Sequence, residues 1–380
     1  MSRRALFGGV LISCALSLVA SCARGPGNPP APRSVVDVSE AGTNAPLPPP
    51  PEPVSERRPL AGWLEVKGPR IMTPEGKPFH GRGANINDTR SCDSCSWEPP
   101  HVDEVLRRID MLVDGWQASF VRLLLESYPD AGPSPGRVHY RNVLEDEQYF
   151  QDVMRIVGHI GKKRGVYVLL SLWHDPSLSP MGWPTERTRA VWKKLARGLR
   201  DMPFVMFGLV NEPQKNEQGL LDGEVWTAMN ETVAAIRSVE EPGKHHIVTV
   251  QGTREWGRVL DYYVAHPITA GRGVNIAYET HVYNRPARFD ELVTRPSAKL
   301  PVIIGEMGVI DDKNAKMLPE DCTALMDLAE KLDVPWLAYT FHTNCPPNLL
   351  VDSAGACGVG VSLAPSPWGR LVKERLAKSW

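Results

Sequence analysis

The sequence predicts a single (β/α)8 TIM barrel, an α/β fold, with an N-terminal β-hairpin plug. Short apolar runs typical of buried strands alternate with longer segments of helical hydrophobic spacing from residue 60 to the C-terminus. A doubly wound open sheet is the alternative architecture, but no glycine-rich phosphate loop follows the first expected strand. The length of 380 residues fits one such barrel, since barrels routinely exceed ~250 residues as a single domain.

The N-terminus carries an export signal. An apolar run from Ala5 to Ala20 follows Ser2-Arg3-Arg4 and is too short and too diluted by Ser and Gly for a spanning helix. It ends in Leu18-Val19-Ala20-Ser21-Cys22, which resembles a bacterial lipobox and implies cleavage before Cys22 and acylation of its thiol. We expect a lipoprotein signal peptide over residues 1–21 and a lipid anchor at the outer membrane or cell surface. An ordinary signal peptide with secretion is the alternative, and Sec and twin-arginine export both stay open.

Residues 22–59 are rich in Pro, Ala and Ser and show no hydrophobic periodicity. This composition predicts an extended, disordered tether, so the folded domain is expected over residues 60–380. The domain opens with two short strand-like segments at 63–67 and 70–72. They predict a hairpin that closes the end of the barrel opposite the site.

Strands and helices then alternate. Strands are expected at residues 83–86, 119–125, 166–172, 204–210, 246–251, 274–281, 302–306 and 336–341. Helices are expected at 102–116, 147–164, 186–199, 224–239, 256–264, 290–293, 319–332 and 367–379. In the first helical segment, Val102, Val105 and Ile109 share one face, and the other segments follow the same spacing.

Two of the expected strands end in a glutamate. Phe204 to Val210 is an unbroken apolar run, typical of a strand buried on both faces, and Pro213 ends it just after Glu212. The strand at 302–306 repeats the design and ends in Glu306. In a barrel both carboxylates point into the C-terminal mouth. Such a pair is what a glycosidase needs, one as proton donor and one as nucleophile or base.

The formal net charge of −1 gives no electrostatic footprint for nucleic acid and indicates a neutral rather than a polyanionic substrate. After Cys14 and Cys22, five cysteines remain. We expect a Cys345–Cys357 disulfide, because the two share one loop after the last strand and the exported compartment permits it. Cys92-Asp-Ser-Cys95 fits a tight bridge or a metal site, but no second CxxC or HxxxH completes a zinc site. We therefore expect no metal and no cofactor.

Six short motifs follow one another along the folded part of the chain. They are Gly81-Arg82-Gly83-Ala84-Asn85, Phe120-Val121-Arg122, Trp173-His174-Asp175, Leu209-Val210-Asn211-Glu212-Pro213, Thr280-His281-Val282-Tyr283 and Ile304-Gly305-Glu306. With them the chain from Trp63 onward resembles glycoside hydrolase family 5, the cellulase family. Its clan carries catalytic glutamates on strands four and seven.

The resemblance implies a role for each motif residue. Glu212 is the expected acid/base, protonated at rest, and Glu306 the nucleophile, kept ionised by Arg122. Asn211 is expected to bind the sugar 2-hydroxyl, whose hydrogen bond strengthens as oxocarbenium character develops. The remaining expected substrate-binding residues are His174, His281, Tyr283, Trp256 and Trp183.

One departure from the family concerns the last strand. The family usually carries a Trp near its end, where this chain reads Ala338-Tyr339-Thr340-Phe341-His342. Either Phe341 takes the role of a sugar platform or that subsite differs.

The resemblance implies a retaining, endo-acting β-glycosidase that cuts a β-1,4-glucan and acts as a monomer. The glucan preference depends on Val248-Thr249-Val250-Gln251-Gly252-Thr253 followed by Trp256, which is similar to the endoglucanase branch. A β-mannanase or another β-glucanase is the first alternative. A non-catalytic polysaccharide-binding lipoprotein is the second, and the presence of Glu212, Glu306 and Arg122 argues against it.

Overall fold

The computed structural model describes residues 58–88, 101–125, 143–172, 182–213, 216–311, 315–351 and 360–380. Eight parallel strands close into a barrel in chain order, the last pairing with the first. They are β3 (Arg82–Asn87), β4 (Phe120–Leu125), β5 (Tyr167–Leu172), β6 (Val205–Gly208), β7 (Val248–Gln251), β8 (Ile276–Val282), β9 (Val302–Met307) and β12 (Trp336–Ala338). The predicted (β/α)8 barrel is confirmed, with each strand inside or close to its expected range.

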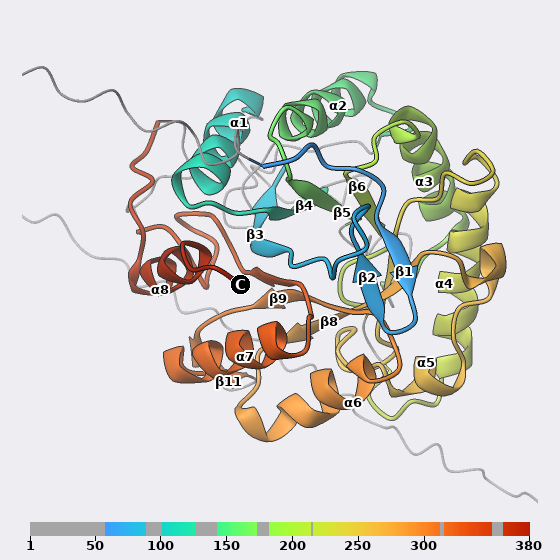
Figure 1. The fold of residues 1–380 in the computed structure, drawn as a ribbon. Helices are drawn as coiled ribbons and strands as arrows, with labels where there is room; N and C mark the ends of the chain where they lie inside the picture. The colour runs from blue at the N-terminus through green and yellow to red at the C-terminus, as the bar shows by residue number, and fades with distance from the viewer. Residues whose placement is uncertain are drawn as a thin grey trace, which may run out of the picture. The chain divides into compact units, whose positions relative to one another are not determined.

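Helices surround the barrel (Figure 1). They are α1 (Val102–Asp110), α2 (Glu147–Gly161), α3 (Glu186–Leu199), α4 (Asp222–Arg237), α5 (Asp261–Ala265), α6 (Arg295–Ser297), α7 (Pro319–Lys331) and α8 (Pro367–Leu376). Side-chain caps fix three of their N-termini: Asp146 caps α2, Thr185 caps α3 and Ser366 caps α8.

One helix is shorter than its hydrophobic spacing predicts. The sequence predicts a helix at 256–264, but α5 begins only at Asp261. The backbone of Glu255 and Trp256 is left-handed, with φ of 50° and 56°, and this conformation cannot start a right-handed helix. The segment before α5 is a turn that presents Trp256 to the mouth of the barrel.

The predicted hairpin plugs the N-terminal end of the barrel. Strand β1 (Glu65–Lys67) pairs antiparallel with β2 (Arg70–Met72). Leu64 and Ile71 pack in one buried cluster with Phe120 and Tyr167, the first residues of β4 and β5. Because this end is closed by apolar packing, only the opposite mouth is open to a substrate.

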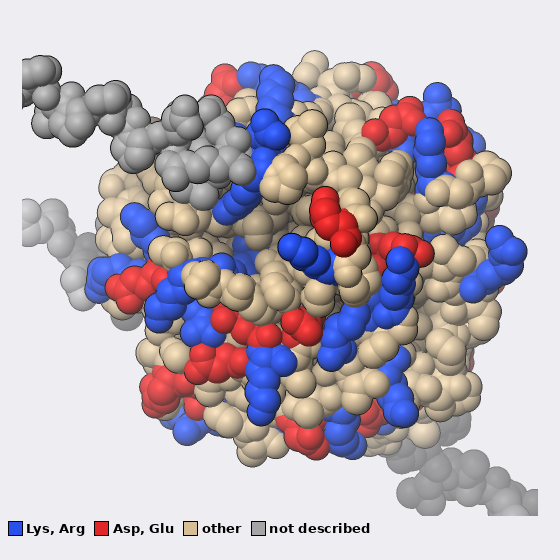
Figure 2. Space-filling model, in the orientation of Figure 1, with Lys and Arg blue, Asp and Glu red and all other residues tan. Residues whose placement is uncertain are grey.

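The face drawn in Figure 2, on the hairpin side, carries Lys and Arg interspersed with Asp and Glu. This mixture agrees with the net charge of −1. No helix of the described residues has the length and hydropathy needed to cross a bilayer. Cys22, Cys92, Cys95 and Cys357 lie outside the described residues, so the lipid anchor and the disulfide pairings stay predictions. Cys322 is a buried thiol in α7.

Candidate active site

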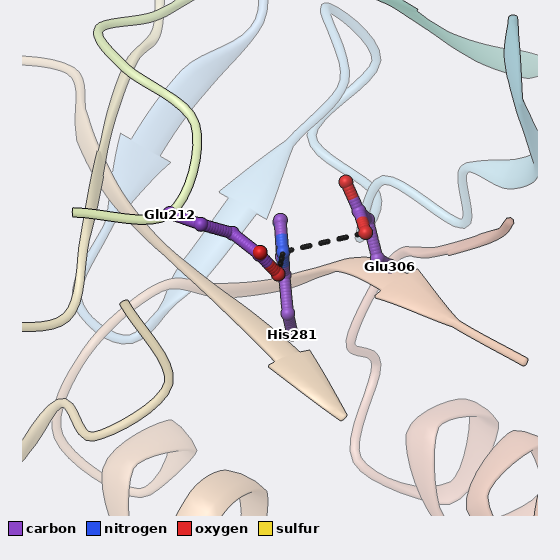
Figure 3. A group of neighbouring side chains, drawn as sticks. All are labelled: Glu212, His281 and Glu306. Atoms are coloured by element: carbon purple, nitrogen blue, oxygen red, sulfur yellow. Dashed lines mark hydrogen bonds and ion pairs between the residues drawn. The ribbon is translucent and has the colours of Figure 1, made fainter. Parts of the chain in front are cut away.

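Glu212 and Glu306 meet in the open mouth, as their places at two strand ends predict. Figure 3 shows them on either side of His281. Glu306 lies in β9, and Glu212 follows β6 in a left-handed conformation, φ 49°, with its N–H donating to Gln251 Oε1 over 2.5 Å. One carboxyl oxygen of Glu212, one of Glu306 and one ring nitrogen of His281 lie within 4.8 Å of one another. The strand end and the turn after it thus bring two carboxyl groups to one point.

Arg122 is a buried arginine that donates hydrogen bonds to several side chains of the site. It is fully buried in β4, and its Nη1 donates to Glu306 Oε1 over 2.7 Å and to Asn85 Oδ1 over 2.8 Å. Its Nη2 donates to Asn211 Oδ1 over 2.8 Å and to Ser171 Oγ over 2.9 Å. Since the amide oxygen of Asn211 is used by Arg122, the amide nitrogen is the edge that can donate to a substrate hydroxyl.

Glu306 is held at both of its oxygens. Arg122 binds Oε1, and the hydroxyl of Tyr283 donates to Oε2 over 2.9 Å. Burial raises the pKa of the Tyr283 hydroxyl well above its ordinary value, so Tyr283 stays a donor. Tyr283, expected from the sequence as a substrate-binding residue, therefore contacts Glu306 directly. Both bonds orient the carboxylate without covering it, because Glu306 and Tyr283 still line the cavity.

His281 links three carboxyl groups. Its Nδ1 lies 2.8 Å from Glu212 Oε1 and 3.5 Å from Glu306 Oε2, and its Nε2 lies 3.0 Å from Glu279 Oε1. Burial alone would lower the pKa of His281, but Glu306, Glu212 and Glu279 together raise it to about 9. The imidazole is therefore protonated at neutral pH and donates from both nitrogens.

The two glutamates differ in pKa in the order opposite to the sequence prediction. Burial would raise the pKa of Glu212, but the hydrogen bond and charge of His281 hold it below its ordinary value. For Glu306, burial and the charge of Glu212 outweigh His281 and Arg122 and raise the pKa. The reason is that His281, protonated because its pKa is raised to about 9, lies with Nδ1 2.8 Å from Glu212 Oε1 and so favours the ionised carboxylate. Glu212 and His281 share this proton and titrate as a unit.

Glu279 is a further member of the hydrogen-bond network around Arg122 and His281, and the sequence motifs did not indicate it. It is fully buried in β8, with Oε1 2.8 Å from Arg122 Nε, and Oε2 accepts from Thr249 Oγ1 over 2.8 Å. Burial would raise its pKa, but Arg122 and His281 lower it to about 2. The available signal was a carboxylate two residues before His281, on the same face of a strand. Gly305 makes room for it, since a Cβ there would lie 2.2 Å from Glu279 Oε1.

The mouth encloses a cavity of about 370 Å³. Trp256 lines it and is 42% exposed, and its role as a sugar platform stays a prediction. The lining residues are Asn211, Glu212, Trp256, Arg258, Tyr283, Glu306, Ile310, Ala315, Tyr339, Pro346 and Pro347.

Phe341 does not take the platform role that the sequence offered it. Its ring is fully buried, edge to face with Trp116 at 4.9 Å between centroids, because the chain turns it outward against the helical layer. Tyr339 lines the cavity instead. Trp183 is partly buried against the hydrophobic core, and its role as a platform stays a prediction. His174 lies outside the described residues.

Glu212, His281 and Glu306 form the group with metal-ligand spacing within the described part of the chain. The pKa of about 9 keeps both nitrogens of His281 protonated at neutral pH, so a metal ion would have to displace one of these protons to bind there. The arrangement instead suits proton transfer and nucleophilic attack. A (β/α)8 barrel with two carboxyl groups converging at its C-terminal mouth defines a glycoside hydrolase.

The chain belongs to the cellulase family, glycosyl hydrolase family 5, whose family model matches residues 72–344. No curated protein matches it. Among solved structures, the native β-glucanase from Saccharophagus degradans is similar, with 21% identity, a TM-score of 0.64 and coverage of 87% of this chain and 97% of that chain. The catalytic domain of an endoglucanase from Thermobifida fusca has 17% identity, a TM-score of 0.64 and coverage of 86% and 100%. These likenesses show the barrel fold.

Replacing Glu279 with glutamine is expected to move the alkaline limb of kcat to lower pH by about one unit or more. The anionic Glu279 favours the proton on His281, so removing its charge lowers the pKa of His281 from about 9. The pair Glu212–His281 then loses its proton earlier as pH rises. KM should change little, because Glu279 does not line the cavity. The measurement is a pH–rate profile on a soluble β-glucan.

Glu240→Gln is the matched control for this experiment. Glu240 is a second buried carboxylate whose pKa is lowered to about 2, and it also contacts an arginine and a histidine, Arg237 and His246. It does not line the cavity. Both variants lose a buried ion pair, but only Glu279→Gln should move the pH profile. Equal profiles in the two variants would make Glu279 merely structural.

Proposed function

We propose that this protein is a retaining, endo-acting β-1,4-glucanase. The observation that carries the proposal is the approach of Glu212 and Glu306, with one carboxyl oxygen of each within 4.8 Å of the other. Retaining glycosidases separate their carboxyl groups by roughly 5–5.5 Å, whereas inverting ones need roughly 6.5–9.5 Å to admit a water. The short separation supports direct attack by one carboxylate.

In the first step, an oxygen of Glu306 attacks the anomeric carbon and the bond to the leaving sugar breaks. Glu212 gives its proton to the leaving oxygen, and His281 Nδ1 lies 2.8 Å away to supply that proton to Glu212. In the second step, Glu212 takes a proton from water, which attacks the same carbon and frees Glu306. The buried Arg122 and the hydroxyl of Tyr283 hold Glu306 in line throughout.

Several observations support a β-glucan as substrate. The chain belongs to the cellulase family, and the Saccharophagus degradans β-glucanase has been solved with cellotetraose bound. The exposed ring of Trp256 at the rim suits the flat face of a glucosyl unit. A β-mannanase is the alternative, and rates on soluble cellulose derivatives, mixed-linkage glucan and mannans separate the two. A binding protein without turnover would release no reducing ends from any of them.

The decisive experiment is the stereochemistry of the first product. Proton NMR of a fresh cello-oligosaccharide digest should show the β-anomer first, with the α-anomer growing in later at the rate of spontaneous mutarotation. A sample of β-anomer without the protein gives that rate. If the α-anomer forms first, the protein inverts configuration and the proposed mechanism fails.

We also propose that the protein is held at the cell envelope by a lipid on Cys22, as its lipobox-like segment indicates. Replacing Cys22 with serine should abolish labelling by a fatty-acid analogue and release the protein from membranes. A chain reduced to residues 60–380 should stay soluble and active, because the region before it has no core-forming pattern. Membrane fractionation checks both expectations. A Cys22→Ser protein that still sediments with membranes would contradict the anchor.

A further inference from the structure

Arg258 lines the cavity, and the proposed mechanism does not use it. It follows the left-handed turn at Glu255 and Trp256, and its guanidinium lies 5.8 Å from the ring centroid of Trp256 and 5.7 Å from that of Tyr283. Its backbone is fixed, because its N–H donates to Arg254 O over 3.0 Å and its carbonyl accepts from Thr280 Oγ1 over 2.8 Å. The side chain therefore lies between two aromatic rings of the site.

The guanidinium of Arg258 has no hydrogen bond or ion pair with the described residues, and its Nε is buried without a partner. Other arginines near the mouth are paired. Arg122 binds Glu306, and Arg254 binds Asp222. Glu255, three residues before Arg258, pairs with Arg288 instead. An unpaired buried donor costs free energy, so its position at the cavity wall calls for a ligand.

Arg258 is also a cation of the site that no described carboxylate approaches to ion-pair distance. Glu212 and His281 share one proton, so together they carry no net charge whichever of them holds it. Arg122 contacts both Glu279 and Glu306, whereas Arg258 contacts neither. A neutral sugar hydroxyl can accept a hydrogen bond from Arg258 but leaves its charge without an anionic partner.

We propose that the cavity recognises a β-glycan with a carboxylate on a sugar next to the scissile bond, and that Arg258 binds this carboxylate. The inference rests on the proposed glycosidase function of the same site. A planar guanidinium matches a carboxylate with two parallel hydrogen bonds, which a hydroxyl cannot form. The substrate class is therefore an acidic glycan of the uronic-acid type, which revises the neutral substrate indicated by the net charge.

A carboxylate bound to Arg258 would also raise the pKa of Glu212, the proposed general acid. The charge of Arg258 is one of the influences that keep the pKa of Glu212 low in the empty site. A carboxylate bound to Arg258 cancels that influence, so the pKa of Glu212 rises when the acidic substrate binds. For kcat, the alkaline limb should therefore lie at higher pH with an acidic substrate than with its neutral analogue.

The test uses a β-1,4-linked gluco-oligosaccharide that contains one glucuronosyl unit, and its methyl ester, which has the same shape without the charge. The wild-type kcat/KM should favour the acid by about 10-fold to 100-fold, the range expected of a hydrogen bond to a charged group. In Arg258→Gln this acid-to-ester ratio should fall to near one. Arg288→Gln, which removes an arginine already paired with Glu255 and Glu291, should keep the wild-type ratio.

A wild-type ratio of one or less, or a preference that persists in Arg258→Gln, would overturn the inference. Binding of both oligosaccharides to Glu306→Ala, measured by calorimetry, gives the same ratio without turnover. Cleavage of cellotetraose separates a failure of the role given to Arg258 from a failure of the proposed function. If it is cleaved with retention but the acid is not preferred, only the role of Arg258 is wrong. If no glycan is cleaved, the proposed function is wrong as well. Circular dichroism checks that the variants fold.

Discussion

Glu306→Ala is expected to reduce kcat on a β-1,4-glucan by ~10⁴-fold or more, with little change in folding. In the proposed mechanism Glu306 supplies the atom that bonds to the anomeric carbon, and no other described carboxylate is placed to replace it. Glu212 lies on the other side of His281, and Glu279 is fully buried behind Arg122. Removing Glu306 also leaves Arg122 with Glu279 as its remaining carboxylate partner.

Added azide should partly restore turnover in this variant. The missing side chain leaves space for azide to attack the anomeric carbon of an activated aryl β-glycoside directly, which gives a glycosyl azide of inverted, α configuration. Proton NMR of the product resolves the anomer. The wild-type protein under the same conditions should give no azide product, and it serves as the control. A β-azide from Glu306→Ala would exchange the roles assigned to the two glutamates.

Glu212→Ala should show the second large effect, and it should depend on the leaving group. Glucans need protonation of the leaving oxygen, so their hydrolysis should fall by roughly 10²–10⁴-fold, the contribution of a general acid. Aryl glycosides with a good leaving group need little protonation. The glycosyl-enzyme on Glu306 should therefore form at nearly the normal rate and accumulate, because no base activates the water.

Azide should release that intermediate with retained, β configuration, since it attacks a bond already inverted once. The check is again proton NMR, together with an initial burst of aryl alcohol before the steady state. Mass spectrometry of the stalled protein should find the sugar on the peptide that contains Glu306. Equal losses on glucans and on activated aryl glycosides would show that Glu212 is not the acid.

The sequence was sufficient to place the two glutamates of the candidate site. An apolar run such as Phe204 to Val210 can only be buried on both faces, and a proline or a polar turn after it fixes where the strand ends. In a barrel of parallel strands all such ends share one mouth, so Glu212 and Glu306 had to converge there. The family resemblance added Arg122, Asn211 and Tyr283, and the structure places Arg122 and Tyr283 in contact with Glu306 and Asn211 in contact with Arg122.

The protonation of the site was decided by the tertiary structure. Glu279 looks like an isolated charge within a strand until β4, β8 and β9 close together and place Arg122 on one side and His281 on the other. The order of the pKa values of Glu212 and Glu306 follows from that arrangement. This order depends on distances of about 3 Å between charged groups on different strands. Local hydrophobic patterns in the sequence do not predict such distances.

The sequence also did not predict in which direction side chains point in the irregular segments. The turn at Glu255 and Trp256 reads as helical by its spacing, yet two left-handed residues convert it into the wall that carries Trp256 and Arg258. After β12, Phe341 turns into the core and Tyr339 faces the cavity. Strands and helices can be predicted from the sequence, because the burial of their side chains repeats with a fixed period along the chain. Which aromatic ring or cation faces the substrate depends on single backbone angles that only packing against distant strands selects.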